Sequence, residues 1–90
     1  MKKKPRELER IMKGVANHRR IEILELLGRT PEMSVIEIAD WIKSDPKNVS
    51  AHITKLAIAG LVMKRHEGNL VRHKLTNRGK SILQFVRIIE

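Results

Sequence analysis

The sequence predicts a small α+β domain that is mostly α, in which helices are followed by a two-stranded β-hairpin and a C-terminal helix. Apolar residues recur at helical spacing over most of the chain, and capping residues precede these segments. One stretch, residues 61–75, instead carries two strand-like runs around a Gly-Asn pair. Because 90 residues can build only one core, we expect a single domain over residues 1–90, with residues 1–4 as a basic N-terminal tail.

The first two helices are each predicted from a start signal and an apolar stripe. Pro5 suits the first turn of the first helix, whose apolar residues are Leu8, Ile11, Met12 and Val15. Asn17 can cap the second helix, and Gly28 is expected to end it. The apolar residues between Asn17 and Gly28 recur at helical spacing and are expected to face the core.

The next two helices are predicted to lie close together in the chain. Ser34 and Glu37 form a capping box at the start of the third helix, which is expected to run to about residue 42. After a very short connection, Asp45 and Pro46 begin the fourth helix, over residues 45–59, and Gly60 follows its end. Two capped helices joined by so few residues are typical of a helix-turn-helix.

Two strands are predicted over residues 61–66 and 70–75, where apolar, β-branched and basic side chains are mixed. Gly68-Asn69 between them tolerates positive φ, which a tight hairpin turn requires. Thr76 then caps a last helix over residues 77–90. A helix-turn-helix followed by such a hairpin, the wing, and a further helix makes a winged helix-turn-helix fold.

The positive charge is concentrated in one part of the chain. The whole sequence carries a net charge of +9, but residues 43–80 hold nine basic and two acidic residues, whereas residues 5–42 hold six basic and seven acidic ones. A surface that only keeps a protein soluble does not require this segregation. It favours a polyanionic partner over a merely solvated face.

From Ala16 to Thr76 the sequence resembles the ArsR-type winged-helix regulators. The residues that carry the resemblance are Ala16-Asn17, Arg20-Ile21, Ile23-Leu24, Leu27, Ile38-Ala39, Val49-Ser50, His52-Ile53, Leu56, Ala59-Gly60-Leu61-Val62 and Leu75-Thr76. The resemblance implies a homodimer whose fourth helix enters the major groove and whose wing touches the flanking backbone. Two positions depart from the family: Lys55 stands where an apolar residue is usual, and Ile58 where a charged one is usual.

The candidate DNA-reading residues lie on the fourth helix, opposite its predicted core stripe. They are Lys47, Asn48, Ser50, Ala51, His52, Thr54 and Lys55. An Asn near the helix start suits a bidentate contact with adenine, and the two lysines suit guanine or phosphate. The alternative is an ordinary solvated helix face. His52 lies at the border of the face, where a half-buried position beside the third helix competes with contact to DNA.

The wing supplies the candidate phosphate contacts, which are Lys64, Arg65, His66, Arg72 and Lys74. Like charges across a hairpin repel, and phosphate would compensate them. The alternative is a charged edge that blocks strand pairing. His73 alternates with apolar neighbours and is expected inside the domain.

A homodimer interface is predicted from the first and last helices. In the last helix, Ile82, Phe85, Val86 and Ile89 suffice to pack on the chain's own domain, which leaves Leu83 and Ile88 outside that stripe. The predicted dimerisation residues are therefore Leu8, Ile11, Met12, Val15, Leu83 and Ile88. The alternative is that the extra residues are ordinary surface hydrophobes at a frayed terminus.

Several functions are not expected. The sequence has no cysteine, and no two of its four histidines share a helical face, so no metal and no cofactor are expected. It has no phosphate loop or catalytic triad motif, so we do not expect an enzyme. We expect a cytoplasmic, nucleoid-associated regulator, a repressor that binds specific double-stranded DNA and no membrane. A winged-helix module for protein contact and an RNA-binding domain are the alternatives.

Overall fold

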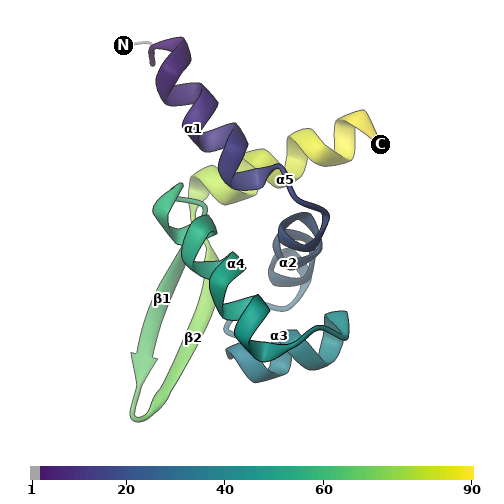
Figure 1. Ribbon diagram of the computed structural model, residues 1–90, viewed down its shortest axis with the longest axis vertical. Helices are drawn as coiled ribbons and strands as arrows, with labels where there is room; N and C mark the ends of the chain where they lie inside the picture. Colours follow the sequence, from purple (N-terminus) through teal and green to yellow (C-terminus); the bar gives the residue numbers. More distant parts are fainter. Residues whose placement is uncertain (1–2) are drawn as a thin grey trace.

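The computed structural model describes residues 3–90 and has the predicted architecture (Figure 1). Its elements in chain order are α1 (Pro5–Val15), α2 (His18–Arg29), α3 (Val35–Ile42), α4 (Pro46–Ile58), β1 (Val62–Glu67), β2 (Leu70–Leu75) and α5 (Asn77–Ile89). Helices α2 and α4 pack on the strands of the hairpin, and α3 packs on α2 and α4. Helix α5 begins at the base of the hairpin, and α1 and α5 lie at the end of the domain away from α3 and the wing tip (Figure 1). The fold is a winged helix-turn-helix.

The predicted helix starts are confirmed, because each capping side chain accepts a hydrogen bond from a backbone N–H in the first turn of its helix. The Asn17 side chain accepts from the N–H groups of residues 19 and 20, at 2.9 and 3.3 Å. Ser34 and Glu37 form the reciprocal capping box. Asp45 accepts from the N–H of residue 47 at 2.7 Å, and Thr76 from that of residue 79 at 3.0 Å. Four of the five helices therefore begin on a cap that is readable in the sequence.

The wing is an antiparallel pair whose register runs from Val62 opposite Leu75 to Glu67 opposite Leu70. The two residues left between the strands make the turn, and Gly68 has φ +61°, as the hairpin prediction required. On its other side β2 is anchored to the loop before α3, because Met33 and His73 form an isolated antiparallel bridge. The base of the wing is thus tied to the helix-turn-helix.

The core is made by the three central helices, the base of the hairpin and one residue of each outer helix. Its residues are Val15, Ile23, Leu24, Leu26, Leu27, Met33, Ile38, Ala39, Val49, Ile53, Leu56, Leu61, Val62, Leu75 and Leu83. His73 is 1% exposed within it, as expected, and its Nδ1 lies 2.8 Å from the carbonyl oxygen of Met33. Burial lowers the pKa of His73, so the neutral ring is the form that the core holds.

Two predictions about helix packing are wrong. Gly28 does not end α2, which continues to Arg29; a Cβ at Gly28 would lie 2.5 Å from Cδ2 of Leu83, so the glycine lets α5 approach closely. Leu83 does not face outward but is 4% exposed in the domain's own core. Phe85 and Ile89, which were expected to pack inward, are instead 46% and 64% exposed. The last helix is therefore rotated relative to the expectation.

The connection between α4 and β1, residues 59–61, is called the joint here, and the start of α5 holds it. Its three successive carbonyl oxygens accept hydrogen bonds from Arg78 Nη1 at 3.0 Å, from Thr76 Oγ1 at 2.6 Å and from the Thr76 N–H at 3.1 Å. Gly60, with φ +77°, allows the chain to turn there. Gly79 is buried, and a Cβ on it would run into the carbonyl oxygen of Leu61. The joint therefore has little freedom to move.

Candidate nucleic-acid interface

The outward face of α4 is exposed along its whole length and is mainly polar up to Lys55, with Ile58 exposed at its end. Lys47, Asn48, Ser50, Ala51, Thr54 and Lys55 are all exposed, while Val49, Ile53 and Leu56 are buried on the other side. The structure therefore brings these six predicted reading residues together on one surface. The Thr54 hydroxyl donates to the carbonyl of Ser50 at 3.0 Å, so it is already engaged within the helix. Asn48 and the two lysines carry the polar groups suited to base edges and phosphates.

His52 is half-buried, and its partner comes from a part of the chain that the helical spacing did not indicate. Arg20 of α2 donates from Nε to His52 Nδ1 at 3.2 Å. The Nη1 group of Arg20 donates to the carbonyls of Lys13 and Gly14, at 3.2 and 3.3 Å. The guanidinium of Arg20 thus connects the end of α1 to α4. Partial burial is the main cause that lowers the pKa of His52, and the charge of Arg20 lowers it further. The lowered pKa favours the neutral ring, so Nδ1 stays available as an acceptor.

Within the wing, two of the five cationic residues are compensated by glutamates. Arg65 and Arg72 face each other across the strands, and Glu67 accepts from both, at 3.2 and 3.0 Å. Glu32 adds a second pair with Arg65 Nη2 at 2.6 Å, and its carbonyl accepts from Arg72 at 3.0 Å. These bonds raise the pKa of Arg65 and lower that of Glu67. The repulsion expected between basic side chains across the hairpin is therefore largely compensated by these two glutamates.

The other three wing candidates remain available to a partner. Lys64, His66 and Lys74 are exposed, and across residues 3–90 none of them has a side-chain hydrogen bond or ion pair. Glu67, two residues after Arg65 and five before Arg72, is the signal in the sequence that could have separated these three from the two arginines. Glu32 lies 33 residues before Arg65 and could not be found from the sequence. The free cations of the interface are therefore the lysines of the wing and of α4.

The predicted dimerisation residues divide into exposed and buried ones. Leu8, Met12 and Ile88 are 49%, 45% and 72% exposed, whereas Ile11 is partly buried and Val15 is 6% exposed in the chain's own core. Val15 and Leu83 are thus already buried within the chain's own domain. Phe85 and Ile89 join the exposed set. The apolar surface of α1 and α5, named the terminal-helix patch, consists of Leu8, Met12, Phe85, Ile88 and Ile89.

The part of the chain that the structure describes contains no group of three or more His, Cys, Asp or Glu side chains placed to hold a metal ion. In residues 3–90 no helix has the length and apolar character needed to span a membrane.

A winged helix-turn-helix in which α4 presents exposed lysines defines a class of proteins, and comparison with known proteins identifies the family. The HVO_A0114 family matches residues 15–76, and the chain belongs to that family. A homologue of the cadmium resistance transcriptional regulatory protein CadC from Staphylococcus aureus is 28% identical over 74 residues, which are 82% of this chain and 61% of the relative. The chain thus spans less than two thirds of that relative's length.

Two solved structures agree along most of the chain. HlyU from Vibrio cholerae superposes with a TM-score of 0.84 at 28% identity, over 99% of this chain and 97% of that one. The homodimeric winged helix-turn-helix DNA-binding domain of Mb0332 from Mycobacterium bovis, a possible ArsR-family regulator, has a TM-score of 0.83 at 28% identity over 92% and 77%. The resemblance to ArsR-family regulators is therefore confirmed, and the chain's relatives are transcriptional regulators.

Proposed function

We propose that this chain is a sequence-specific regulator that binds double-stranded DNA and acts as a repressor. Helix α4 would read the major groove, and the wing would contact the flanking backbone. The observation that carries the proposal is the outward face of α4, where Lys47, Asn48 and Lys55 are exposed opposite a fully buried stripe. Such a face matches the width and the hydrogen-bonding pattern of a major groove.

The alternatives fit this face less well. A module for protein contact would place apolar side chains there, and Ile58 is the one large apolar residue exposed on α4 among residues 46–58. A single-stranded RNA site would offer aromatic stacking platforms, but Trp41 and Phe85 lie on α3 and α5. We place the regulator in the cytoplasm, on the nucleoid. We expect its DNA binding to need no metal, since the sequence has no cysteine and no two of its four histidines share a helical face.

Substitutions on α4 and on the wing should have different effects on DNA binding. Lys47→Ala or Asn48→Ala should weaken binding to the preferred site by about 1–3 kcal/mol and flatten the sequence preference, because these side chains face base edges. Lys64→Ala should weaken binding to all DNA sequences alike, because a phosphate contact carries no sequence information. The measurement is fluorescence anisotropy with a site selected from random duplexes and with a scrambled duplex.

Arg65→Ala is the matched control on the wing, since its guanidinium is already bound by Glu32 and Glu67. We expect it to affect DNA affinity less than Lys64→Ala does. Loss of sequence preference in the wing variants, with α4 variants unaffected, would show that the assignment of reading and anchoring is reversed.

We also propose that the chain is a homodimer formed through the terminal-helix patch. Five large apolar side chains are exposed on two helices that project from the same end of the domain (Figure 1). Exposed apolar side chains in this number on two helices at one end of a domain support an interaction surface there. A twofold dimer would set two copies of α4 on successive major grooves, about 34 Å apart, so the preferred site should be a near-palindrome.

The double substitution Phe85→Lys, Ile88→Lys should convert the dimer to a monomer, because it buries two unpaired charges in the interface. Sedimentation at tens of micromolar without DNA should give twice 10.4 kDa for the wild type and 10.4 kDa for the variant. Ile36→Lys, Trp41→Lys is the control, since both residues are 65% exposed on α3. A wild-type chain that sediments as a monomer would contradict the proposed dimer.

A further inference from the structure

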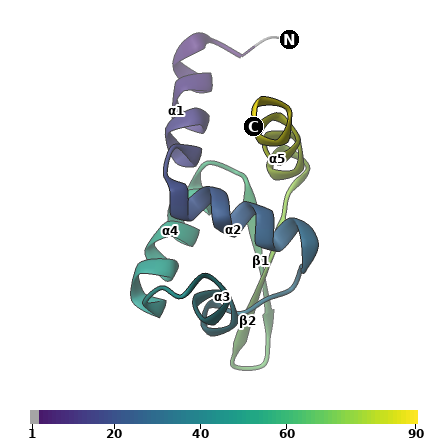
Figure 2. The same cartoon turned by 90° about the vertical axis from the view of Figure 1, so that its right-hand side faces the viewer.

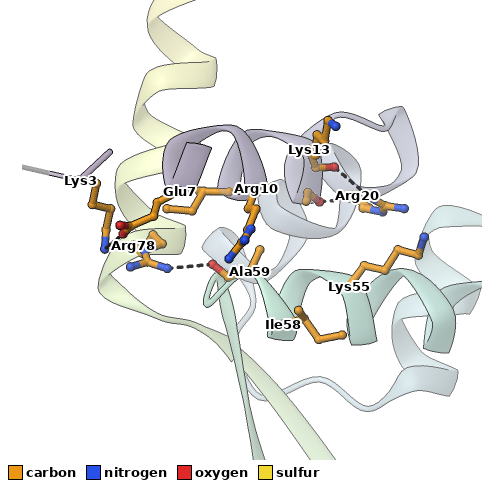
Figure 3. A pocket seen from close by; sticks show the side chains of 11 residues that line it. Lys3, Glu7, Arg10, Lys13, Arg20, Lys55, Ile58, Ala59 and Arg78 are labelled. Atoms are coloured by element: carbon orange, nitrogen blue, oxygen red, sulfur yellow. Dashed lines mark hydrogen bonds and ion pairs between the residues drawn. The ribbon is translucent and has the colours of Figure 1, made fainter. Parts of the chain in front are cut away.

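A groove of about 660 Å³ lies between α1 and the end of α4, and its walls are strongly cationic (Figure 3). A single carboxylate, that of Glu7, stands beside six basic side chains, those of Lys3, Arg10, Lys13, Arg20, Lys55 and Arg78. The groove also has apolar walls, supplied by Ile11, Ile58 and Ala59. Carboxylates pair with only part of this positive charge, whereas both wing arginines are paired with glutamates.

Four of the six basic side chains already have partners, and two do not. Arg20 and Arg78 donate to backbone carbonyls, and Lys3 and Lys13 pair with glutamates on α1, at 3.8 and 3.2 Å. Within residues 3–90, Arg10 and Lys55 have no side-chain hydrogen bond or ion pair. Figure 3 shows Arg10 pointing from α1 toward Ala59 at the end of α4, with Lys55 on the facing helix. The two free cations therefore come from the two opposite walls.

The groove lies beside the proposed recognition surface. Lys55 and Ile58 belong both to the wall of the groove and to the exposed face of α4, and Ile58 is 82% exposed. A Cβ on Gly14 would lie 2.5 Å from Cβ of Ala59, so α1 crosses the end of α4 in close contact. Figure 2 shows α1 above α4 along one edge of the molecule and α5 on the other side. Helix α1 thus continues the surface that α4 begins.

The groove and the terminal-helix patch lie on different faces of α1. At about 100° per residue, Arg10 and Gly14 point roughly opposite to Leu8 and Met12. A second copy of the chain that covers the apolar residues of α1 therefore leaves the cationic face uncovered.

We propose that the α1–α4 groove binds phosphates of the DNA backbone beyond the bases that α4 reads, so that α1 lengthens the contact with the duplex. The inference rests on the proposed DNA binding and adds a second anchoring site to it. An arginine fork and a lysine on opposite walls suit phosphate oxygens, which accept hydrogen bonds and carry the compensating charge. Each phosphate neutralised in this way releases a counterion, which makes the contact measurable as a salt dependence.

The test compares the groove variant Arg10→Ala with the control Arg29→Ala, which removes the same charge from an exposed position on α2. Affinity is measured against salt on a duplex with long flanks and on one trimmed to the selected site. On the long duplex the groove variant should lower the slope of log affinity against log salt by about 1 per protomer. On the trimmed duplex the groove variant and the wild type should have equal slopes, and the control should keep the wild-type slope on both.

Glu7→Gln gives a test in the opposite direction, because it removes the one carboxylate in the groove. It should tighten binding to the long duplex and leave the trimmed duplex unchanged, a gain that misfolding cannot produce. Hydroxyl-radical footprinting should show flanking protection with the wild type and its loss with the groove variant.

Equal slopes for wild type and groove variant on the long duplex overturn the inference while leaving the proposed DNA binding intact. Absence of any duplex binding by the wild type overturns both. Adenosine monophosphate is the probe for a small phosphorylated ligand: micromolar binding that Arg10→Ala abolishes, without any effect of the flanks, would assign the groove to an effector instead of to DNA.

Discussion

Raising the salt concentration from 50 to 200 mM should weaken binding of this chain to its DNA site by about 10³- to 10⁵-fold, if a dimer engages six to ten phosphates. The physical reason is counterion release, and its source is the net +7 carried by residues 43–80 together with the cations of α1. Lys64, Lys74 and Lys55 are free to neutralise phosphates, whereas Arg65 and Arg72 are bound by glutamates. Anisotropy titrations at five salt concentrations measure the slope directly.

The slope of log affinity against log salt distinguishes an interface dominated by phosphate contacts from one that is not. Affinity that changes less than tenfold over this range would exclude phosphate neutralisation as the main source of binding and with it the proposed docking. The variant Lys64→Ala, Lys74→Ala should reduce the slope by about 2 per protomer, because it removes two free cations. A charge-matched pair on α2, Arg19→Ala and Arg29→Ala, should change it much less.

Gly79→Ala should destabilise the domain, although the same change at an exposed helical position usually stabilises by up to about 1 kcal/mol. A Cβ at residue 79 meets the Leu61 carbonyl oxygen, which cannot move aside because the Thr76 N–H holds it at 3.1 Å. Overpacking against backbone typically costs about 1–3 kcal/mol, which exceeds the gain in helix propensity. For a domain of this size each kcal/mol lowers Tm by about 4–8 °C.

Thermal unfolding followed by circular dichroism measures this effect. Ser81→Ala, two residues further along α5 and exposed, is the control and should change the unfolding free energy by no more than about 0.5 kcal/mol. If Gly79→Ala were as stable as the wild type, the close packing of α5 on the joint would be ruled out.

The features that the sequence predicts well are those that depend on neighbouring residues. A cap and its partner lie within three positions, so the interactions of Asn17, Ser34, Asp45 and Thr76 are readable without any tertiary structure. The same holds for the hairpin turn at Gly68 and for the buried stripe of α4, where one strongly polar face leaves a single possible orientation.

The features that the sequence does not predict depend on residues far apart in the chain. Helical spacing gives the relative angles of the apolar residues in α5, but that helix is apolar on most of its circumference. Gly28 determines which face of α5 packs on α2. It leaves room for Leu83, which is buried, and Phe85 remains exposed. Likewise Glu32, one of the two partners of Arg65, and Arg20, the partner of His52, lie 33 and 32 positions away. Pairing of side chains over such separations requires the fold itself.

The joint has a consequence for how a duplex would be selected. Its three carbonyls accept hydrogen bonds from Thr76, the N-cap of α5, and from Arg78 in its first turn, which restricts the angle between α4 and the wing. A duplex held by both elements at once would have to fit that angle, and would deform wherever its relaxed shape does not. The energy of this deformation depends on the base steps between the two contacts, and pyrimidine–purine steps deform most easily. Base pairs that no side chain touches would thus contribute to the choice of site through the stiffness of the DNA.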